Sequence, residues 1–440
     1  MPAALELRTM GHASLVLAEK GSHPILLTDP WLVGSVYWRS WWLQHYPNEA
    51  ELDWLARSET VYVTHEHPDH FHMPSIRRLG TGPRYLFPEL AERGFLAHMA
   101  QHGFRAEILP ALTWRPIGDG LSILSIPAWN DDSLLLIETP GALILNLNDA
   151  KPLPPVLKAI RRLVDRVGKP TVMACSYSPA SLINSFSGEH GNLHLKTPAQ
   201  YVDYVCRTCD RLGADYYVPF ASQAEFRRDD SLWANEYRTT YQDLERYWRC
   251  RARLLPPYVT LDLQDFSHSA VPPDRYRGAL PATLARLTQV RETAERDAII
   301  DDDDVAGLRR KLNAFRLLWM LLFRRGFVFA LGERRFKYAP WRGTLEEADA
   351  DAGDFVVTVP KLAMKEAIRN NHVSDLGITM FVRVRLHRAI DVRKVYGMFV
   401  LFAVDDYRHL AGAKAFWHWI RTGIRHSVGL KLPAPAPDRG

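Results

Sequence analysis

One short segment, residues 64–70, concentrates side chains that bind metal ions. Its sequence is Thr-His-Glu-His-Pro-Asp-His, and its candidate ligands are His65, His67, Asp69 and His70. Side chains two residues apart in an extended segment point to the same side, so the first two histidines can share one metal ion. The turn that proline favours then directs the aspartate and the last histidine toward a second ion. The spacing therefore predicts a two-metal site, in which imidazole and carboxylate suit zinc, iron or manganese.

The H-x-H-x-D-H spacing resembles the metal-binding motif of the metallo-β-lactamase fold, which is an αββα sandwich. The resemblance implies a carboxylate that bridges the two ions and lies at the end of a later strand. Asp149 fits this position because it follows the apolar segment 143–147. The alternative is an Asx-type turn before Lys151. If the metals serve hydrolysis, Asp69 also has a catalytic role, because it would orient the attacking hydroxide.

The same fold supplies a third histidine to the first metal from a loop that here covers residues 127–132. That loop has the sequence Pro-Ala-Trp-Asn-Asp-Asp and contains no histidine. Asn130, Asp131 or Asp132 must replace the histidine, or the first metal keeps an open position. A carboxylate there would shift the preference of the site from zinc toward iron or manganese.

Four further residues could complete or support the site. His190 and His194 are candidate ligands of the second metal, with substrate binding or an exposed loop as the alternatives. Asp29 ends an earlier apolar strand and could hydrogen-bond a ligating histidine from behind. His12 opens the first predicted hairpin and could point into the site, but an ordinary turn histidine is an equal alternative.

Length and composition are those of a globular protein. The chain has 440 residues, of which 47% are hydrophobic, and this length favours two or three domains. No segment approaches the roughly 20 apolar residues that span a bilayer, and we expect no signal peptide. The four cysteines are too few for a disulfide scaffold, which predicts a cytoplasmic protein. A net charge of +5 from scattered basic residues favours an anionic small molecule over nucleic acid as the partner.

The pattern of apolar residues predicts an α/β sandwich followed by a smaller region. Predicted strands of the sandwich cover 13–18, 24–28, 60–63, 121–126, 134–138, 142–147, 170–174 and 216–220. Predicted helices cover 73–79, 89–102 and 197–212. Further along the chain, we expect a helix over 305–323, with the apolar run 317–323 buried, and strands at 354–359, 380–386 and 398–402. The resulting division is a catalytic domain at 1–255, a C-terminal α+β region at 256–430 that packs on it, and a disordered tail at 431–440.

Several segments together resemble the CMP-N-acetylneuraminate hydroxylase family, whose catalytic part is lactamase-like. The matching segments are 27–32, 41–45, 64–70, 144–149, 185–188 and 218–221, with a weaker likeness at 367–371 and 382–385. That family joins its lactamase-like part to a Rieske iron-sulfur domain, which needs two Cys and two His in paired motifs. This chain contains no such pair of motifs. The resemblance therefore implies a di-metal enzyme without a Rieske cluster of its own.

Three functions are compatible with these residues. The favoured one is a di-iron oxygenase that hydroxylates or oxidises a polar small molecule and takes electrons from a separate protein. The alternative is a hydrolase of a phosphoester, lactone or amide, in which two zinc or manganese ions lower the pKa of a bridging water. The third is a non-catalytic role with a degraded site.

Two groups of side chains could contact the substrate. Arg39, Arg227 and Arg228 could clamp a phosphate or carboxylate, a prediction that depends on charge type alone. The aromatic residues of the segment 31–42 could wall a pocket, and a tryptophan-rich core is the alternative.

Overall fold

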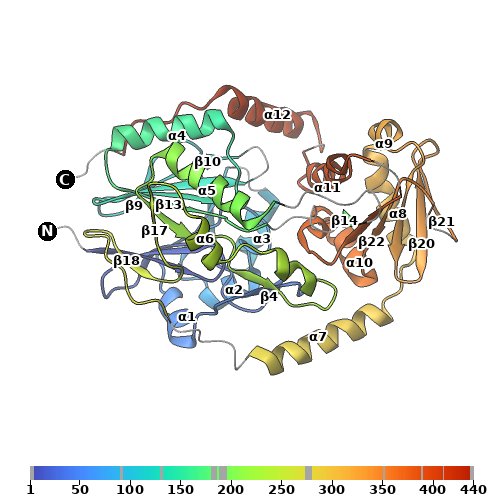
Figure 1. Cartoon of the computed structure of the whole chain (residues 1–440), viewed down its shortest axis with the longest axis horizontal. Coiled ribbons are helices and arrows are strands. Elements are labelled where there is room, and N and C mark those ends of the chain that lie inside the picture. Colours follow the sequence, from blue (N-terminus) through green and yellow to red (C-terminus); the bar gives the residue numbers. More distant parts are fainter. Residues whose placement is uncertain are drawn as a thin grey trace.

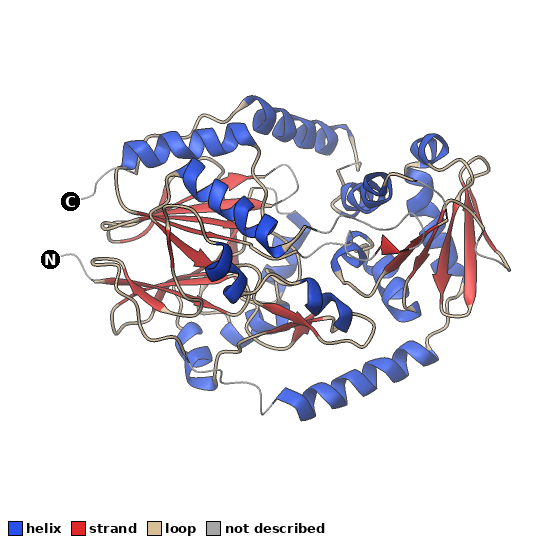
Figure 2. Ribbon diagram, viewed as in Figure 1, coloured by secondary structure: helices blue, strands red, loops and turns tan. Residues whose placement is uncertain are grey.

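The computed structural model describes residues 4–89, 93–128, 132–179, 186–187, 196–272, 280–349, 352–387, 390–409 and 411–436. Two seven-stranded sheets pack face to face in its larger part, with helices on both outer sides (Figures 1 and 2). This arrangement confirms the predicted αββα sandwich. A smaller sheet with its own helices forms the other end of the molecule.

The first sheet contains, in spatial order, β18 (Thr260–Asp262), β1 (Leu5–Met10), β2 (Ser14–Glu19), β3 (Pro24–Thr28), β6 (Thr60–Tyr62), β7 (Arg84–Pro88) and β8 (Arg105–Leu109). The second contains β17 (Arg253–Leu254), β15 (Tyr216–Pro219), β13 (Thr171–Cys175), β12 (Leu143–Asn148), β11 (Ser133–Glu138), β10 (Leu121–Pro127) and β9 (Arg115–Gly118). Every residue of β11 and β12 is buried, as expected for strands covered on both faces. One buried cluster joins the inner faces of the two sheets.

The helices of the sandwich cover its two outer faces. On the first sheet lie α1 (Glu49–Leu55), α2 (Met73–Leu79) and α3 (Arg93–Gln101), and on the second lie α4 (Pro154–Val167) and α5 (Pro198–Leu212). The sequence itself delimits α5, because Thr197 forms a capping box at its start and Gly213 ends it in the left-handed conformation. The short helices η2 (Leu232–Tyr237) and α6 (Tyr241–Tyr247) follow the last long strand.

A three-stranded sheet connects the sandwich to the C-terminal region. It contains β16 (Ala224–Phe226), β5 (Trp41–Leu43) and β4 (Ser35–Val36). The C-terminal sheet contains β14 (Phe186–Ser187), β23 (Arg383–Leu386), β22 (Phe355–Thr358), β19 (Phe327–Leu331), β20 (Arg334–Ala339) and β21 (Thr344–Glu347). Its helical elements are α7 (Leu280–Asp297), α8 (Asp302–Ala314), α9 (Arg316–Leu322), α10 (Lys361–Asn370), η3 (Ser374–Ile378), α11 (Val392–Asp406) and α12 (Ala413–Val428).

Three local predictions for the C-terminal region are wrong. Residues 398–402 lie inside α11, because buried side chains recur there with helical spacing over 392–402. The single helix expected over 305–323 breaks at Phe315 into α8 and α9. The apolar run 317–323 is not buried throughout, since Leu317 is 77% exposed and Leu321 is 74% exposed.

The chain departs from the expected division at two places. β18 pairs with β1, so a strand beyond residue 255 belongs to the first sheet. The tail expected to be disordered is hydrogen-bonded to the sandwich over its described part, 431–436. The backbone carbonyl of Ala434 accepts from the Trp114 indole, and the amide of Ala436 donates to the Glu138 carboxylate. The division into a catalytic domain and a C-terminal region stays a prediction.

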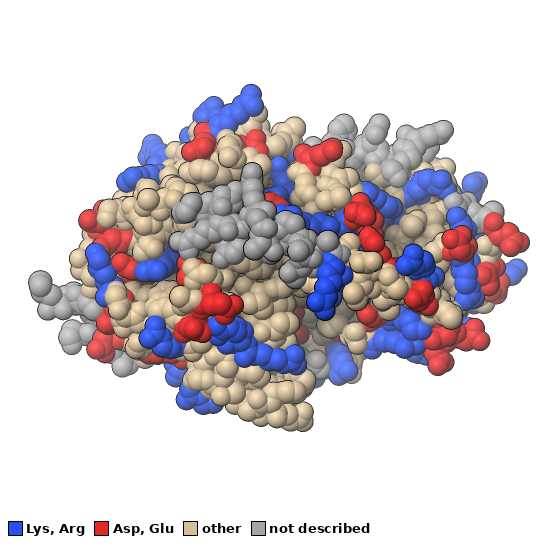
Figure 3. Space-filling view, turned by 90° about the horizontal axis from the view of Figure 1, so that it is seen from below, with Lys and Arg blue, Asp and Glu red and all other residues tan. Residues whose placement is uncertain are grey.

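Two global features bear on function. Within the described ranges, none of the helices is long and apolar enough to cross a membrane. Seen from below, the surface carries basic and acidic side chains interspersed with one another (Figure 3).

Candidate metal centre

The candidate centre lies where strands of both sheets end. Residues 64–70 follow β6 of the first sheet, and Asp149 follows β12 of the second. Asn148, the last residue of β12, has a φ of 41°, a left-handed conformation that asparagine tolerates better than most residues and that turns the chain sharply. His12 lies in the turn between β1 and β2. The two sheets therefore bring together residues that are far apart in the sequence.

The first group of possible ligands comprises His65, His67 and Asp149, which can each offer one ligand atom within a common radius suited to a metal ion. His65 Nε2 is 2.8 Å from His67 Nδ1 and 4.0 Å from Asp149 Oδ1. The three side chains therefore form one group of possible ligands, and the sharing of one ion by the two histidines stays a prediction.

The second group comprises His12, Asp69 and His70, all of them buried. Asp69 Oδ2 is 3.4 Å from His12 Nε2 and 3.5 Å from His70 Nε2. The sequence predicted the last two as ligands and His12 only as a supporting residue. In the structure, the Nε2 atom of His12 is about as close to Asp69 Oδ2 as that of His70 is.

The two groups adjoin through His70 and Asp149. His70 Nε2 is 3.6 Å from Asp149 Oδ1, and neither of these buried atoms has a hydrogen-bond partner among the described residues. A buried nitrogen and a buried carboxylate oxygen without partners are costly unless something else binds them. Bound metal ions would satisfy both atoms, so the residues fit a two-metal centre that His70 and Asp149 would help to hold.

Two buried carboxylates hold the histidines from behind. Asp29 Oδ2 is 3.3 Å from His70 Nδ1, and Asp29 also accepts hydrogen bonds from the backbone and hydroxyl of Thr64. Asp132 Oδ1 is 3.2 Å from His65 Nδ1, on the ring edge opposite the first group. Such contacts fix the orientation of a ligating imidazole. Asp29 thus lies where the sequence predicted, whereas Asp132, expected as a possible ligand, lies behind its histidine.

The loop that contains β4 and β5 closes one side of the centre. Tyr37 donates a hydrogen bond of 2.5 Å to Asp69 Oδ1. The rings of Trp31 and Trp41 lie 5.6 Å and 5.8 Å from that of His12. Both predictions for these aromatic residues therefore apply, because they are buried in one cluster and also wall the centre. The sequence did not single out Tyr37 as a partner of Asp69.

The C-terminal region supplies two residues that the sequence did not indicate. Asp375, in η3, is only 6% exposed, and its carboxyl interacts electrostatically with Asp69 and His65. The Tyr407 ring lies 6.3 Å from that of His67. Hydrogen bonds hold η3 in place, since Trp41 donates to the carbonyl of Ile378. Both residues lie more than 300 positions after the motif, so no local signal could have identified them.

Burial and mutual charge shift the pKa values of the centre. Burial alone would lower the pKa of His70, but the carboxylates of Asp69, Asp149 and Asp29 outweigh it and raise that pKa to about 10. Burial and the neighbouring His65 lower the pKa of His67 to about 4. The pKa values of Asp69 and Asp149 lie below the ordinary value despite burial, because His70 stabilises their charged forms. The carboxylates of Asp69 and Asp149 are therefore ionised at neutral pH and can bind cations.

Asp375 behaves in the opposite way. Burial, followed by the charges of Asp406 and Asp69, raises its pKa to about 8. In the metal-free protein this carboxyl therefore holds a proton at neutral pH. A protonated acid next to a metal centre can donate a proton during a reaction.

A small cavity of about 20 Å³ opens beside His12. Its lining includes Trp41, Ser178, Phe226 and Arg238. Arg238 has a side chain only 13% exposed, and its nearest carboxylate oxygen, on Glu225, is 3.9 Å away. Burial lowers the pKa of its guanidinium. A weakly paired, buried arginine next to the centre is a candidate contact for an anionic group.

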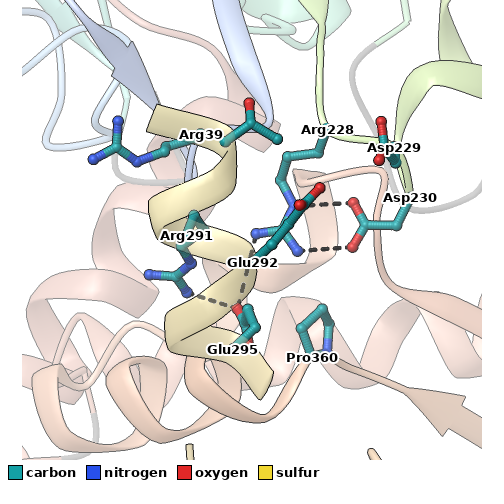
Figure 4. A pocket seen from close by; sticks show the side chains of 9 residues that line it. Arg39, Arg228, Asp229, Asp230, Arg291, Glu292, Glu295 and Pro360 are labelled. Atoms are coloured by element: carbon teal, nitrogen blue, oxygen red, sulfur yellow. Dashed lines mark hydrogen bonds and ion pairs between the residues drawn. The ribbon is translucent and has the colours of Figure 1, made fainter. Parts of the chain in front are cut away.

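The arginines predicted to bind substrate lie elsewhere. Arg39 and Arg228 line a separate cavity of about 250 Å³ against α7 (Figure 4). Arg228 forms a two-pronged ion pair with Asp230 at 2.9 and 2.7 Å, so its charge is already compensated. Arg227 is exposed and pairs with Glu225 at 2.6 Å. A substrate-binding role of these three residues stays a prediction.

Several sequence predictions lie outside the described residues. These are Asn130 and Asp131 of the loop and the two histidines His190 and His194.

The chain is similar in sequence to curated hydroxylases, and solved structures of hydrolases resemble it. No family model matches it. Among curated proteins, it is 24% identical over 209 residues to the human protein named inactive cytidine monophosphate-N-acetylneuraminic acid hydroxylase, a match covering 44% of this chain and 41% of that protein. The match to the gorilla cytidine monophosphate-N-acetylneuraminic acid hydroxylase has the same identity and covers 34% of that protein. The starfish Asterias rubens hydroxylase is 44% identical over 55 residues, 12% of this chain and 8% of that protein. The chain thus matches less than half the length of these relatives.

Solved structures of similar proteins include two hydrolases. The metallo hydrolase Igni18 from Ignicoccus hospitalis has 16% sequence identity and a TM-score of 0.36, over 59% of this chain and 98% of that one. The isothiocyanate hydrolase from Delia radicum gut bacteria has 15% identity and a TM-score of 0.41, over 58% of this chain and 98% of that one. The sandwich topology, the H-x-H-x-D-H motif and the sequence similarity together identify the chain as a protein of the metallo-β-lactamase fold that resembles the cytidine monophosphate-N-acetylneuraminic acid hydroxylases.

Proposed function

We propose that this chain is a di-iron oxygenase that hydroxylates or oxidises a polar, anionic small molecule. The observation that carries the proposal is the donor set of the centre, in which Asp69 and Asp149 share one site with four histidine side chains. Mixed imidazole and carboxylate ligands suit ferrous iron better than a purely imidazole set does. The similarity to the gorilla and starfish proteins named hydroxylases supports the same class of reaction.

The stoichiometry of the reaction shows that it needs a source of electrons and a source of protons. Hydroxylation of a C–H bond by dioxygen consumes two electrons and two protons, and its products are the alcohol and one water. Two ferrous ions held by the two ligand groups would supply the reduction of dioxygen. A separate reductase protein would deliver the electrons.

The residues of the chain have distinct tasks in this proposal. His12, His65, His67, His70, Asp69 and Asp149 hold the ions. Asp29 and Asp132 keep two of the imidazoles in the orientation that directs Nε2 to the metals. Tyr37 fixes Asp69 through its hydroxyl. Asp375 donates one of the protons that the reaction consumes.

Arg238 is the proposed contact for the anionic group of the substrate, because it lines the cavity beside His12. Its guanidinium has no carboxylate within 3.5 Å among the described residues, so it could donate hydrogen bonds to a substrate oxygen. Replacing Arg238 with Gln should raise KM more than it lowers kcat, and Arg238→Lys should restore part of the affinity. An equal KM in the Gln variant would exclude this contact.

The first test combines elemental analysis with oxygen uptake. Protein purified without added metal should contain two irons per chain, and the anaerobically reduced protein should consume dioxygen in proportion to its iron. His65→Ala and Asp149→Ala should lose iron and uptake together. His268→Ala removes an exposed histidine from the segment after β18, outside both ligand groups, and is the matched control. Zinc as the only metal, together with activity in the absence of oxygen, would refute the oxygenase.

A hydrolase is the second candidate, and a specific observation favours it. Asp69 is held from two sides, by Tyr37 at 2.5 Å and His12 at 3.4 Å, beside the space between the two ligand groups. A carboxylate fixed in this way can orient a nucleophilic water, which two zinc or manganese ions would make available as hydroxide at neutral pH. Turnover of phosphoesters, lactones or amides without oxygen and reductant would establish it.

A further inference from the structure

The edge of the molecule formed by α4 and α12 combines exposed apolar side chains with uncompensated positive charge. Figure 1 shows the two helices along the upper edge of the molecule, with the sandwich below α4. The end of α12 adjoins the start of α4, since a Cβ atom at Gly429 would lie 3.7 Å from that of Pro155. Arg166 of α4 also donates to the carbonyl of Pro433, just after α12.

α12 presents an apolar stripe to solvent. Trp417 is 63% exposed, Ile424 is 57% exposed and Val428 is 80% exposed. Ile424 and Val428 follow Trp417 by 7 and 11 residues, so the three side chains lie on one face of a helix with 3.6 residues per turn. The opposite side rests on the protein, where the Trp419 ring stacks on that of His409 at 5.5 Å. A tryptophan and two branched aliphatic side chains therefore project together from the surface.

Positive charges flank this stripe. Lys414, Arg421 and Arg425 of α12 are exposed, and residues 413–428 contain no acidic side chain. α4 adds Lys158, Arg162 and Arg166, also exposed. The single acid of the two helices, Asp165, pairs with Arg161 at 2.8 Å. The surface seen from below, by contrast, mixes both signs (Figure 3).

We propose that the face formed by α4 and α12 binds the surface of an anionic lipid bilayer, with Trp417, Ile424 and Val428 inserted at the boundary between headgroups and acyl chains. A helix with aromatic and aliphatic residues on one face and basic residues beside them is the type that lies in this interface. Anionic headgroups complement the basic rim. The 16 residues of α12 span about 24 Å, less than the hydrocarbon core, so the helix lies on the bilayer and does not cross it.

A nucleic acid fits this face less well. Phosphate groups would pair with the arginines, but Ile424 and Val428 have no partner on a phosphate backbone, whereas acyl chains accept them. A second copy of the chain would bring the basic rims of two identical faces together if the faces met symmetrically. Both occupants are outcomes that the experiment distinguishes.

The test is flotation of the full chain with vesicles of phosphatidylcholine, with and without added phosphatidylglycerol. Binding should require the anionic lipid and weaken with salt. Each lysine or arginine near such a surface contributes about 1 kcal/mol, so the triple variant K414Q/R421Q/R425Q should bind on the order of 100-fold more weakly. The variant W417A/I424A should bind at least roughly tenfold more weakly, because its apolar insertion is lost.

Matched controls use α9 and its surroundings. Leu317→Ala/Leu321→Ala removes two apolar side chains that are more exposed than those of Trp417 and Ile424, and R309Q/R310Q/R324Q removes three exposed charges. Both controls should bind like the wild type. Vesicles with brominated acyl chains should quench tryptophan fluorescence in the wild type and less so in Trp417→Phe, which reports insertion at this residue.

Three results would overturn the proposal. The first is equal binding to vesicles with and without phosphatidylglycerol. The second is wild-type binding by the α12 variants. The third is a dimer, or a complex with duplex DNA, that the α12 substitutions abolish while vesicles are not bound. Circular dichroism and metal content of each variant show whether it is folded.

Discussion

The buried carboxyl of Asp375 should make the stability of the metal-free protein fall as pH rises. Its pKa moves from the ordinary value of 3.8 to about 8 on folding. Between these values the unfolded chain has released the proton and the folded chain still holds it, so the free energy of unfolding decreases by about 1.4 kcal/mol per pH unit. Between pH 5 and pH 7 this single group therefore costs about 2.5 kcal/mol of stability.

The substitution that isolates this effect is Asp375→Asn, because the amide has the same shape and does not titrate. Urea unfolding at pH 5, 6 and 7 in the presence of a chelator gives the free energy of unfolding of both proteins. The difference between variant and wild type should move by about 2.5 kcal/mol in favour of the variant across this range. Asp303→Asn, which removes an exposed carboxylate, is the control.

A constant difference between Asp375→Asn and the wild type would refute the reasoning. It would mean that Asp375 is ionised in the folded protein, and then it could not donate a proton near the metal centre at neutral pH. A slope equal to that of Asp303→Asn would lead to the same conclusion.

Three further predictions concern the centre and its support. Asp132→Ala should lower metal affinity by about 10–100-fold and still bind two ions at saturation, whereas Asp149→Ala should bind fewer, as calorimetric titration can show. The pKa of His70 is about 10 in the metal-free protein, so metal must displace a proton from it, and affinity should increase with pH across the neutral range. Calorimetry in two buffers of different ionisation enthalpy should reveal this proton, and equal heats would contradict it. Lys311→Met leaves Asp406, whose side chain is 2% exposed, without its cation, so it should lower the free energy of unfolding in urea titrations by about 3–5 kcal/mol. Lys311→Arg is the control, and a loss below about 1 kcal/mol would contradict this prediction.

The motif and much of the sandwich could be predicted because their signals are local. Short apolar runs broken by turns located the strands. Thr197-Pro198 and Gly213 delimited α5, and the H-x-H-x-D-H spacing placed the candidate ligands on one loop. The error at 398–402 has a local cause as well. A five-residue apolar run is too short to distinguish a strand from a buried helix, and only the longer spacing from Val392 reveals α11.

The roles of individual side chains at the centre depended on distances that the sequence does not contain. The loop composition suggested Asp132 as a ligand, but the residue lies behind His65 because β10 and β11 bring it to the Nδ1 edge. His12 was predicted as a supporting residue but is a possible ligand of the second group, since the turn between β1 and β2 places its Nε2 3.4 Å from Asp69. Charge type alone suggested Arg228, which its ion pair with Asp230 compensates.

The sequence by itself determined that the protein has a series of apolar strands, a metal motif after one strand and a carboxylate after another, because each of these features is encoded within a few neighbouring residues. Only the tertiary structure decided that Tyr37 fixes Asp69, that Asp375 joins the centre from the far end of the chain, and that α12 leaves Trp417 exposed beside a basic rim. The physical reason is that hydrogen bonds, electrostatic shifts and burial act over a few ångströms in space, and the fold alone brings distant residues within that range.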